Sequence, residues 1–164
     1  RRIELDVNKV DKDHHDHFLN GAIFEVYDKT AKSYVTTLAS GQLMIVGNDV
    51  NEEYEISKDE DFTKIIKTVK TDENKQTILD MDDGTYYSRK VGDDKVSKHV
   101  IKDGKAVLAD AIYGHEYEFK EIKAPTSYQL ADKSKAYKVE ADKETDTIIY
   151  YFENARIVVP NTGV

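Results

Sequence analysis

Three residues of this sequence place a reactive side chain at the end of an otherwise apolar row. Lys9, Glu121 and Asn154 each end a run of alternating residues whose other members are apolar or aromatic. Alternate residues along a β-strand point to the same face of its sheet. The pattern therefore predicts that an amine, a carboxyl and a carboxamide all point into a hydrophobic core, where an unpaired Lys or Glu is costly.

These three groups could form a new covalent bond if they meet in the core. Desolvation disfavours the charged forms of Lys9 and Glu121, so a neutral, nucleophilic amine would lie beside a protonated acid. That acid could hydrogen-bond the carboxamide oxygen of Asn154, polarise its carbon and relay a proton to the leaving ammonia. We therefore expect an amide between Lys9 and Asn154, made once per molecule without a cofactor, with Glu121 as the catalytic group.

A simpler arrangement of the same residues remains open. Lys9 and Glu121 could form an ordinary buried salt bridge with Asn154 as a hydrogen-bonding neighbour. Lys12, Glu118 and Glu153 are the rival reactive residues, but the alternation places Glu118 and Glu153 on the opposite face of their strands.

The three rows define predicted strands at residues 3–10, 116–122 and 147–155. Their core-facing members before the reactive residues are Ile3, Leu5, Val7, Tyr117, Phe119, Ile148, Tyr150 and Phe152. The first strand has polar residues on its other face, which predicts a half-buried strand. Pro125 follows the second row closely and ends that strand, because proline cannot donate to the ladder.

The rest of the chain also reads mainly as β-structure. We expect strands at 18–27, 34–46 with a break at Ser40-Gly41, 77–81, 85–90, 96–102, 105–112 and 136–140, with a hairpin around Asp83-Gly84. The strand at 136–140 should pair with the last strand across a polar turn. One helix is expected where Phe62, Ile65, Ile66 and Val69 form an i, i+3, i+4, i+7 stripe, capped by Ser57 and Glu60.

Composition limits the classes of function. The 164-residue chain is 39% hydrophobic and 34% charged, which is a globular composition, and its net charge of −8 disfavours nucleic acid and anionic membranes as partners. No run is apolar enough to span a bilayer or to act as a secretion signal. The absence of cysteine fits a secreted chain that is stabilised by something other than disulfides.

Several short motifs together resemble one known family. They are KVD at residues 9–11, LNGAIF at 19–24, YEFKEIKAP at 117–125 with Tyr128, and FEN at 152–154. In this order they are similar to a Cna B-type domain of Gram-positive pilins and adhesins. The resemblance covers residues 3–46 and 102–156 and leaves about 48–100 uncovered. It implies an intramolecular isopeptide bond between Lys9 and Asn154, assisted by Glu121.

The fold we expect is mainly β. It is a Cna B-type, prealbumin-like β-sandwich formed by residues 1–156 as one domain, with an α/β insertion at about 48–100. Residues 157–164 would form a tail outside it.

The tail itself, VVPNTGV at residues 158–164, resembles a sortase sorting motif of the LPxTG type. Val159 takes the leucine position and is followed by Pro160, Asn161, Thr162 and Gly163. The resemblance implies acyl transfer at the Thr162–Gly163 bond, with sortase and a neighbouring pilin subunit or peptidoglycan as partners. The alternative is a flexible terminus with a turn-like sequence.

Together these features predict a structural domain of a surface pilin subunit or wall-anchored adhesin, located at the cell wall, with tension carried by the Lys9–Asn154 bond. One alternative is that the insertion recognises a host surface ligand. Another is a turnover enzyme that uses Glu121, which is disfavoured because Glu121 lies in a core row rather than on a loop.

A histidine-rich loop is the remaining candidate site. His14, His15 and His17, with Asp11, Asp13 and Asp16, could coordinate a transition metal. Such dense polar loops are more typical of a solvated surface, and we expect no metal cofactor.

Overall fold

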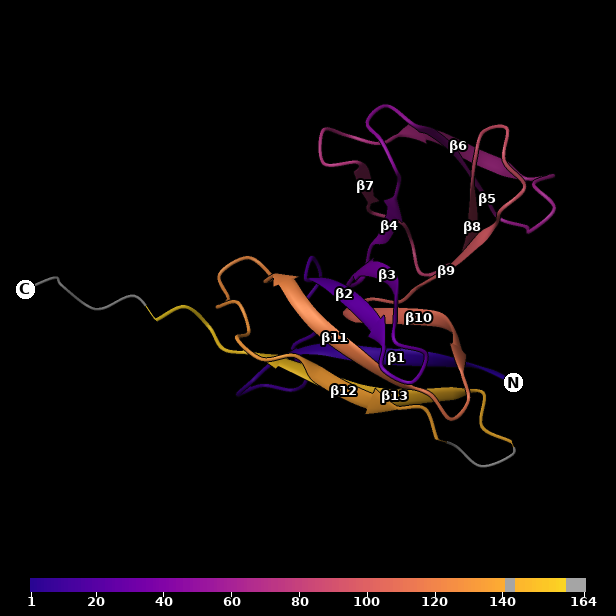
Figure 1. The fold of residues 1–164 in the computed structure, drawn as a ribbon. Coiled ribbons are helices and arrows are strands. Elements are labelled where there is room, and N and C mark those ends of the chain that lie inside the picture. The colour runs from indigo at the N-terminus through magenta and orange to yellow at the C-terminus, as the bar shows by residue number, and fades with distance from the viewer. Residues whose placement is uncertain (141–143, 159–164) are drawn as a thin grey trace, which may run out of the picture.

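The structure, a computed structural model, describes residues 1–140 and 144–158. Two facing sheets form the larger part of the molecule (Figure 1). The first holds, in spatial order, β10 (Lys105–Ile112), β1 (Arg2–Asp11) and β13 (Thr147–Asn154). The second holds β12 (Lys135–Lys138), β11 (Glu116–Lys123), β2 (Ile23–Asp28) and β3 (Ser33–Ala39). This is the β-sandwich that the sequence predicts.

The first and last strands are direct neighbours. β1 pairs with β13 in parallel over eight residue pairs, from Glu4 opposite Thr147 to Asp11 opposite Asn154. On its other side β1 pairs antiparallel with β10. β1 is therefore the central strand of its sheet, and its inner face points at β11 and β2 across the core.

The core between the sheets is filled by the alternating residues of these strands. It includes Leu5 and Val7 of β1, Phe119 of β11 and Phe152 of β13, all buried. The ring of Phe24 packs edge-on against Phe119 and Phe152, with ring centroids 5.8 and 4.9 Å apart. The predicted inward rows of β1 and β11 are thus confirmed.

The outer face of β1 differs from the prediction of a half-buried strand. Asp6 and Asn8 are buried as well. The ammonium groups of Lys102 and Lys105 lie over them, donating to Asp6 Oδ2 at 2.9 Å and to Asn8 Oδ1 at 2.8 Å. The segment that returns from the insertion therefore covers this face with two lysines that hydrogen-bond to it.

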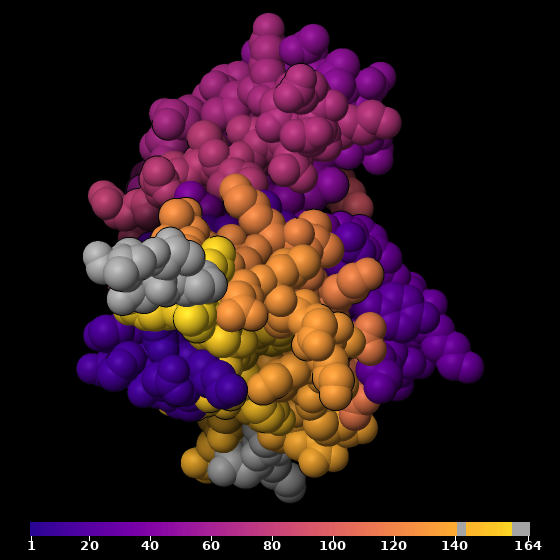
Figure 2. All heavy atoms as spheres, turned by 90° about the vertical axis from the view of Figure 1, so that its left-hand side faces the viewer, coloured from indigo at the N-terminus to yellow at the C-terminus, as the bar shows by residue number. Residues whose placement is uncertain are grey.

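The insertion projects from the sandwich as a separate lobe (Figures 1 and 2). It contains a two-stranded sheet of β4 (Leu43–Val46) and β7 (Gln76–Leu79). A four-stranded sheet has the order β6 (Ile65–Lys70), β5 (Glu53–Ser57), β8 (Gly84–Lys90) and β9 (Ser97–Ile101). The lobe has a small hydrophobic core of its own, which contains Leu43, Ile45, Ile56, Tyr86 and Ile101.

The predicted helix in the insertion is wrong, because the described residues of this lobe form strands, turns and loops. Asp59 forms a loop by accepting hydrogen bonds from the main-chain nitrogens of Thr63 and Lys64 at 3.2 and 2.9 Å, and Ser57 Oγ donates to the same carboxylate. Ile65 and Ile66 then lie exposed in β6. β-branched residues favour strands, and here that preference outweighs the helical spacing.

Two predicted strand pairings and one strand boundary are also wrong. β7 and β8 do not form a hairpin around Asp83-Gly84, since β7 pairs with β4 and β8 with β5 and β9. β12 pairs with β11 in the opposite sheet from β13. β2 begins only at Ile23, and Phe18 makes a single bridge to Val10.

Within residues 1–140 and 144–158 no helix is long and apolar enough to cross a membrane.

A candidate isopeptide site

The structure brings the three predicted site residues together at one end of the sandwich core. Lys9 lies on β1, Asn154 ends β13, and Glu121 lies on β11 in the facing sheet. Their exposed fractions are 0%, 2% and 3%. Because β1 and β13 run parallel, with Lys9 opposite Phe152, the Asn154 side chain lies one step further along the same inner face.

The amine of Lys9 is buried without a carboxylate partner. Its Nζ donates to the main-chain oxygen of Phe152 at 2.7 Å and to that of Val10 at 3.3 Å. Among the described residues no ion pair joins Lys9 to an acid, so the geometry does not support the simple Lys9–Glu121 salt bridge. Burial lowers the pKa of Lys9 to about 8, although the nearby charge of Glu121 acts in the opposite direction.

The carboxamide of Asn154 is held through its nitrogen. Nδ2 donates to Glu121 Oε1 at 2.7 Å and to the main-chain oxygen of Gln129 at 2.8 Å. The main-chain nitrogen of Ala131 donates to the same Glu121 oxygen at 2.9 Å. Glu121 thus contacts the nitrogen that would leave, and not the carboxamide oxygen as the sequence-based mechanism expects.

Two buried polar atoms of this site have no hydrogen-bond partner. They are Glu121 Oε2 and Asn154 Oδ1. A buried polar atom left without a partner costs about 1–3 kcal/mol, so folded proteins keep few of them. Both belong to residues that the sequence assigns to the reaction, and such unsatisfied groups are typical of reactive sites rather than of passive cores.

A pocket of about 240 Å³ reaches the site from solvent. Asn154 lines it together with residues 129–132, Lys135 and Glu153.

Two of the rival residues, Glu118 and Glu153, lie on the faces of their strands opposite the core rows, as the alternation predicts, and Lys12 and Glu153 line the pocket beside Asn154. Glu153 Oε2 lies 2.5 Å from His15 Nε2, where both side chains are exposed. Glu118 is on the outer face of β11, and Lys12 is exposed. None of the three replaces Lys9 or Glu121 at the core site.

The histidine-rich loop is a surface feature in this structure. His14 and His17 have ring centroids 5.2 Å apart, and His15 stacks on Tyr151. Over residues 1–140 and 144–158, no three His, Asp or Glu side chains are grouped closely enough to hold a metal ion.

The sorting-like residues Val159, Pro160, Asn161, Thr162 and Gly163 lie outside the described residues. Just before them, the main-chain nitrogen of Ile157 donates to the oxygen of Ser127 at 3.0 Å. Ile157, the first residue of the expected tail, therefore still bonds to the loop after β11.

Sequence reasoning missed the loop between β11 and β12 as part of the site. Gln129 and Ala131 act through main-chain atoms, which carry no residue-specific signal. The only sequence hint was Tyr128, which belongs to the family-like motif after Pro125.

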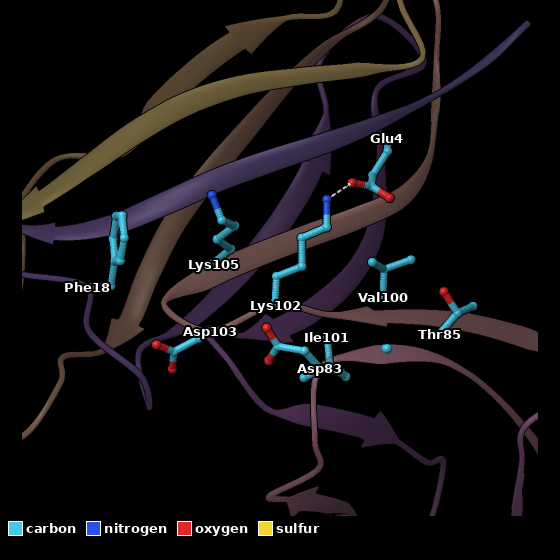
Figure 3. A pocket seen from close by; sticks show the side chains of 10 residues that line it. Glu4, Phe18, Asp83, Thr85, Val100, Ile101, Lys102, Asp103 and Lys105 are labelled. Atoms are coloured by element: carbon cyan, nitrogen blue, oxygen red, sulfur yellow. Dashed lines mark hydrogen bonds and ion pairs between the residues drawn. The ribbon is translucent and has the colours of Figure 1, made fainter. Parts of the chain in front are cut away.

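A second pocket lies where the insertion joins the sandwich (Figure 3). Lys102 lines it and donates to Glu4 Oε2 at 2.5 Å and to the buried Asp6. Burial raises the pKa of Asp6 to about 6, and the hydrogen bond to Glu4 acts in the same direction. Lys102 is thus paired with two carboxylates of β1, while the second oxygen of Asp6, Oδ1, has no hydrogen-bond partner.

The comparisons with known proteins agree with this class of fold. A family model described as SpaA, prealbumin-like fold domain, matches residues 3–156. The chain therefore belongs to this family, and the predicted Cna B-type, prealbumin-like assignment is confirmed. Comparison with curated proteins gives no match.

Several solved structures are similar at low identity. A group B streptococcus pilus 2b backbone protein shares 18% identity at a TM-score of 0.45, over 95% of this chain and 42% of that one. GBS52, a minor pilin of Streptococcus agalactiae, shares 22% identity at a TM-score of 0.40, and the match covers 99% of this chain and 48% of that one. The major pilin SpaD of Corynebacterium diphtheriae shares 20% identity at a TM-score of 0.40, and the match covers 96% of this chain and 31% of that one. The chain spans less than half the length of each of these proteins.

Proposed function

We propose that this chain is a structural domain of a surface pilin subunit or wall-anchored adhesin, stabilised by an isopeptide bond between Lys9 and Asn154. The observation that carries the proposal is the burial of Lys9, Glu121 and Asn154 together, with the Asn154 nitrogen on Glu121. Membership of the SpaA prealbumin-like family supports it, as does the resemblance of the motifs to those of pilins and adhesins.

The reaction uses only groups of this chain. The lone pair of neutral Lys9 Nζ attacks Cγ of Asn154 and forms a C–N bond. Glu121 takes the proton that Nζ loses and delivers one to Nδ2, which it already contacts. The Cγ–Nδ2 bond then breaks and ammonia leaves, so the products are one secondary amide and one ammonia. Glu121 ends unchanged, and the site reacts once because its product stays in place.

Intact mass tests this proposal directly. The folded wild-type chain should weigh one ammonia less than its sequence requires, and Glu121→Ala should keep the full sequence mass. Glu118→Ala removes a carboxylate from the opposite face of the same strand and should still lose ammonia. A folded wild-type chain at full sequence mass would contradict the proposal. Equal linkage in the Glu121 and Glu118 variants would remove Glu121 from the mechanism.

The second part of the proposal is attachment by sortase at the cell surface. A sortase cleaving after Thr162 would join that residue to an amine of a neighbouring subunit or of peptidoglycan. With a hydrophobic anchor segment added after Val164, Thr162→Ala should abolish this joining and leave the Lys9–Asn154 bond intact, because the two reactions use different atoms. Joining at an unchanged rate in that variant would exclude Thr162 as the acyl residue.

A second candidate function is recognition of a host ligand by the insertion. Its support is the exposure of Ile65 and Ile66, 45% and 46%, on β6 at the edge of the insertion sheet. Ile66→Lys should weaken binding to host cells, while the folded variant should still weigh one ammonia less than its own sequence requires. Unchanged binding after charges are placed at both isoleucines would exclude this surface.

A further inference from the structure

The loop between β11 and β12 contacts both partners of the proposed reaction through its main chain. The oxygen of Gln129 accepts from Asn154 Nδ2, and the nitrogen of Ala131 donates to Glu121 Oε1. The carboxamide nitrogen therefore has both of its hydrogens engaged, one by β11 and one by this loop. Two acceptors on separate segments fix the plane of the amide, whereas Glu121 alone would leave it free to rotate about the Cβ–Cγ bond.

The same loop is fastened to the end of the chain. The nitrogen of Gln129 donates to the oxygen of Ala155 at 2.8 Å, and that of Ile157 donates to Ser127 at 3.0 Å. Gln129 Nε2 adds a bond to the oxygen of Arg156 at 2.9 Å. The loop and residues 155–157 thus form a short antiparallel ladder directly after Asn154.

One buried side chain ties this ladder to the strand of the lysine. Asp11 lies on β1, two residues after Lys9, and its side chain is 2% exposed. Its Oδ2 accepts from the Tyr128 hydroxyl at 2.6 Å and from Arg156 Nε at 3.0 Å. Those hydrogen bonds hold the pKa of Asp11 well below its usual range, so the anchor stays charged at neutral pH.

We propose that Tyr128, held by Asp11, is a positioning residue for formation of the isopeptide bond. The hydroxyl of Tyr128 fixes the loop against β1, and the loop carbonyl of Gln129 then presents the carboxamide of Asn154 to the lysine of that same strand. This inference rests on the proposed function, since it concerns the rate of that reaction. Tyr128 does not touch the reacting atoms.

The physical reason is the sensitivity of such a reaction to orientation. Attack on an amide requires the amine to approach the face of the carboxamide, and a small misplacement of the reacting groups can cost on the order of a hundredfold in rate. A carboxamide that rotates freely spends only part of its time in the attackable orientation. Loss of the Tyr128 hydroxyl should therefore slow the reaction without removing any of its chemical groups.

The test compares two tyrosine variants of the full chain. Tyr128→Phe removes the bond to Asp11, and Tyr150→Phe removes a tyrosine bond of equal length, 2.6 Å, to the oxygen of Lys138. Each chain is isolated unfolded, refolded by dilution, and followed by intact mass as ammonia is lost. We expect Tyr128→Phe to react roughly tenfold more slowly than wild type and Tyr150→Phe to react at nearly the wild-type rate.

Two further measurements separate positioning from a general loss of structure. Asp11→Asn should slow linkage as well, and the double variant with Tyr128→Phe should be little slower than Asp11→Asn alone, because Tyr128→Phe removes only one of the hydrogen bonds that the Asp11 carboxylate accepts. In Lys9→Ala, which cannot link, the side-chain amide protons of Asn154 should exchange slowly with water. Adding Tyr128→Phe should speed that exchange about tenfold.

The outcomes distinguish this inference from the proposed function. If wild type links and Tyr128→Phe links as fast as Tyr150→Phe, the positioning role is overturned and the function stands. Unchanged amide exchange in the Lys9→Ala, Tyr128→Phe chain would also overturn it. If wild type refolds but never loses ammonia, the proposed function fails and the positioning role falls with it.

Discussion

Lys9 is the residue whose environment most needs an explanation. Among the residues that the structure describes, it is one of the largest fully buried side chains, although lysine is almost never fully buried without a partner. Within the described part of the chain, its amine donates to main-chain oxygens alone. A permanently charged ammonium in this place would cost several kcal/mol. A neutral amine that is consumed by bond formation avoids that cost.

The rate of bond formation should therefore depend on pH. Burial places the pKa of Lys9 near 8, below its ordinary value, so the neutral nucleophile gains population as pH rises towards 8 and then saturates. We expect the rate after refolding to rise about tenfold per pH unit below about pH 7 and to level off above about pH 8. Time courses of intact mass at several pH values measure this. A rate that falls as pH rises would contradict attack by neutral Lys9.

The three residues of the proposed reaction could be singled out from sequence because each ends a row with a strict period of two. How they contact one another could not. Glu121 meets the nitrogen of Asn154 because the carbonyl of Gln129 draws that nitrogen to the same side. A main-chain carbonyl on a loop has no sequence signature, so the orientation of the carboxamide becomes visible only in the structure.

At the scale of elements, local rules failed where the chain crosses between sheets. The turn-rich segment after β12 suggested a hairpin with β13, but β13 instead enters the other sheet beside β1. Its inward Phe152 can then pack on Phe24 while Asn154 reaches Glu121. Burial of these side chains in the core favours the pairing of β13 with β1, two strands that are far apart in the sequence. Turn-forming residues next to a strand do not predict such a pairing.

The junction between the sandwich and the insertion depends on Gly104. Its φ of +68° lies in the left-handed region, its oxygen accepts from the nitrogen of Lys9 at 2.8 Å, and its nitrogen donates to Asn20 Oδ1 at 2.7 Å. A Cβ at this position would lie 2.1 Å from Cβ of Phe18. The return of the chain to β10 therefore needs glycine.

Gly104→Ala should destabilise the domain by about 2–4 kcal/mol, combining backbone strain with displacement of Phe18. Gly92→Ala is the matched control, since Gly92 also has a positive φ, +86°, but has nothing within 4 Å of the added carbon. It should cost about 1–2 kcal/mol. Denaturant unfolding in the unlinked Glu121→Ala background measures both. Equal losses would show that the contact with Phe18 does not matter.

At the scale of the whole molecule, the proposed bond would give tension its shortest route between the two ends of the sandwich. β1 and β13 run parallel, so the N-terminus and the end of β13 lie at opposite ends of the sandwich (Figure 1). Lys9 is near the end of β1, and Asn154 ends β13. With a bond between them, force applied at the N-terminus would pass along β1 to Lys9, across the bond to Asn154, and on into the residues that follow β13. The insertion and the other strands would then carry none of it.

Single-molecule pulling from the two ends should show this protection. The wild-type chain should not release the segment between Lys9 and Asn154 at any force below covalent rupture. Glu121→Ala should unfold and release roughly 50 nm of contour length, the extended span of that segment. An unfolding step of that length in wild type would mean that tension is not carried by the proposed bond.

Identification of the cross-linked peptide tests the central claim most directly. After complete proteolysis of the folded wild-type chain, tandem mass spectrometry should find one branched peptide joining the segment that contains Lys9 to the segment that contains Asn154. Its mass should be the sum of the two segments minus one ammonia, and Glu121→Ala should yield the two segments separately. Recovery of unmodified Lys9 and Asn154 peptides from fully folded wild-type protein would contradict the account.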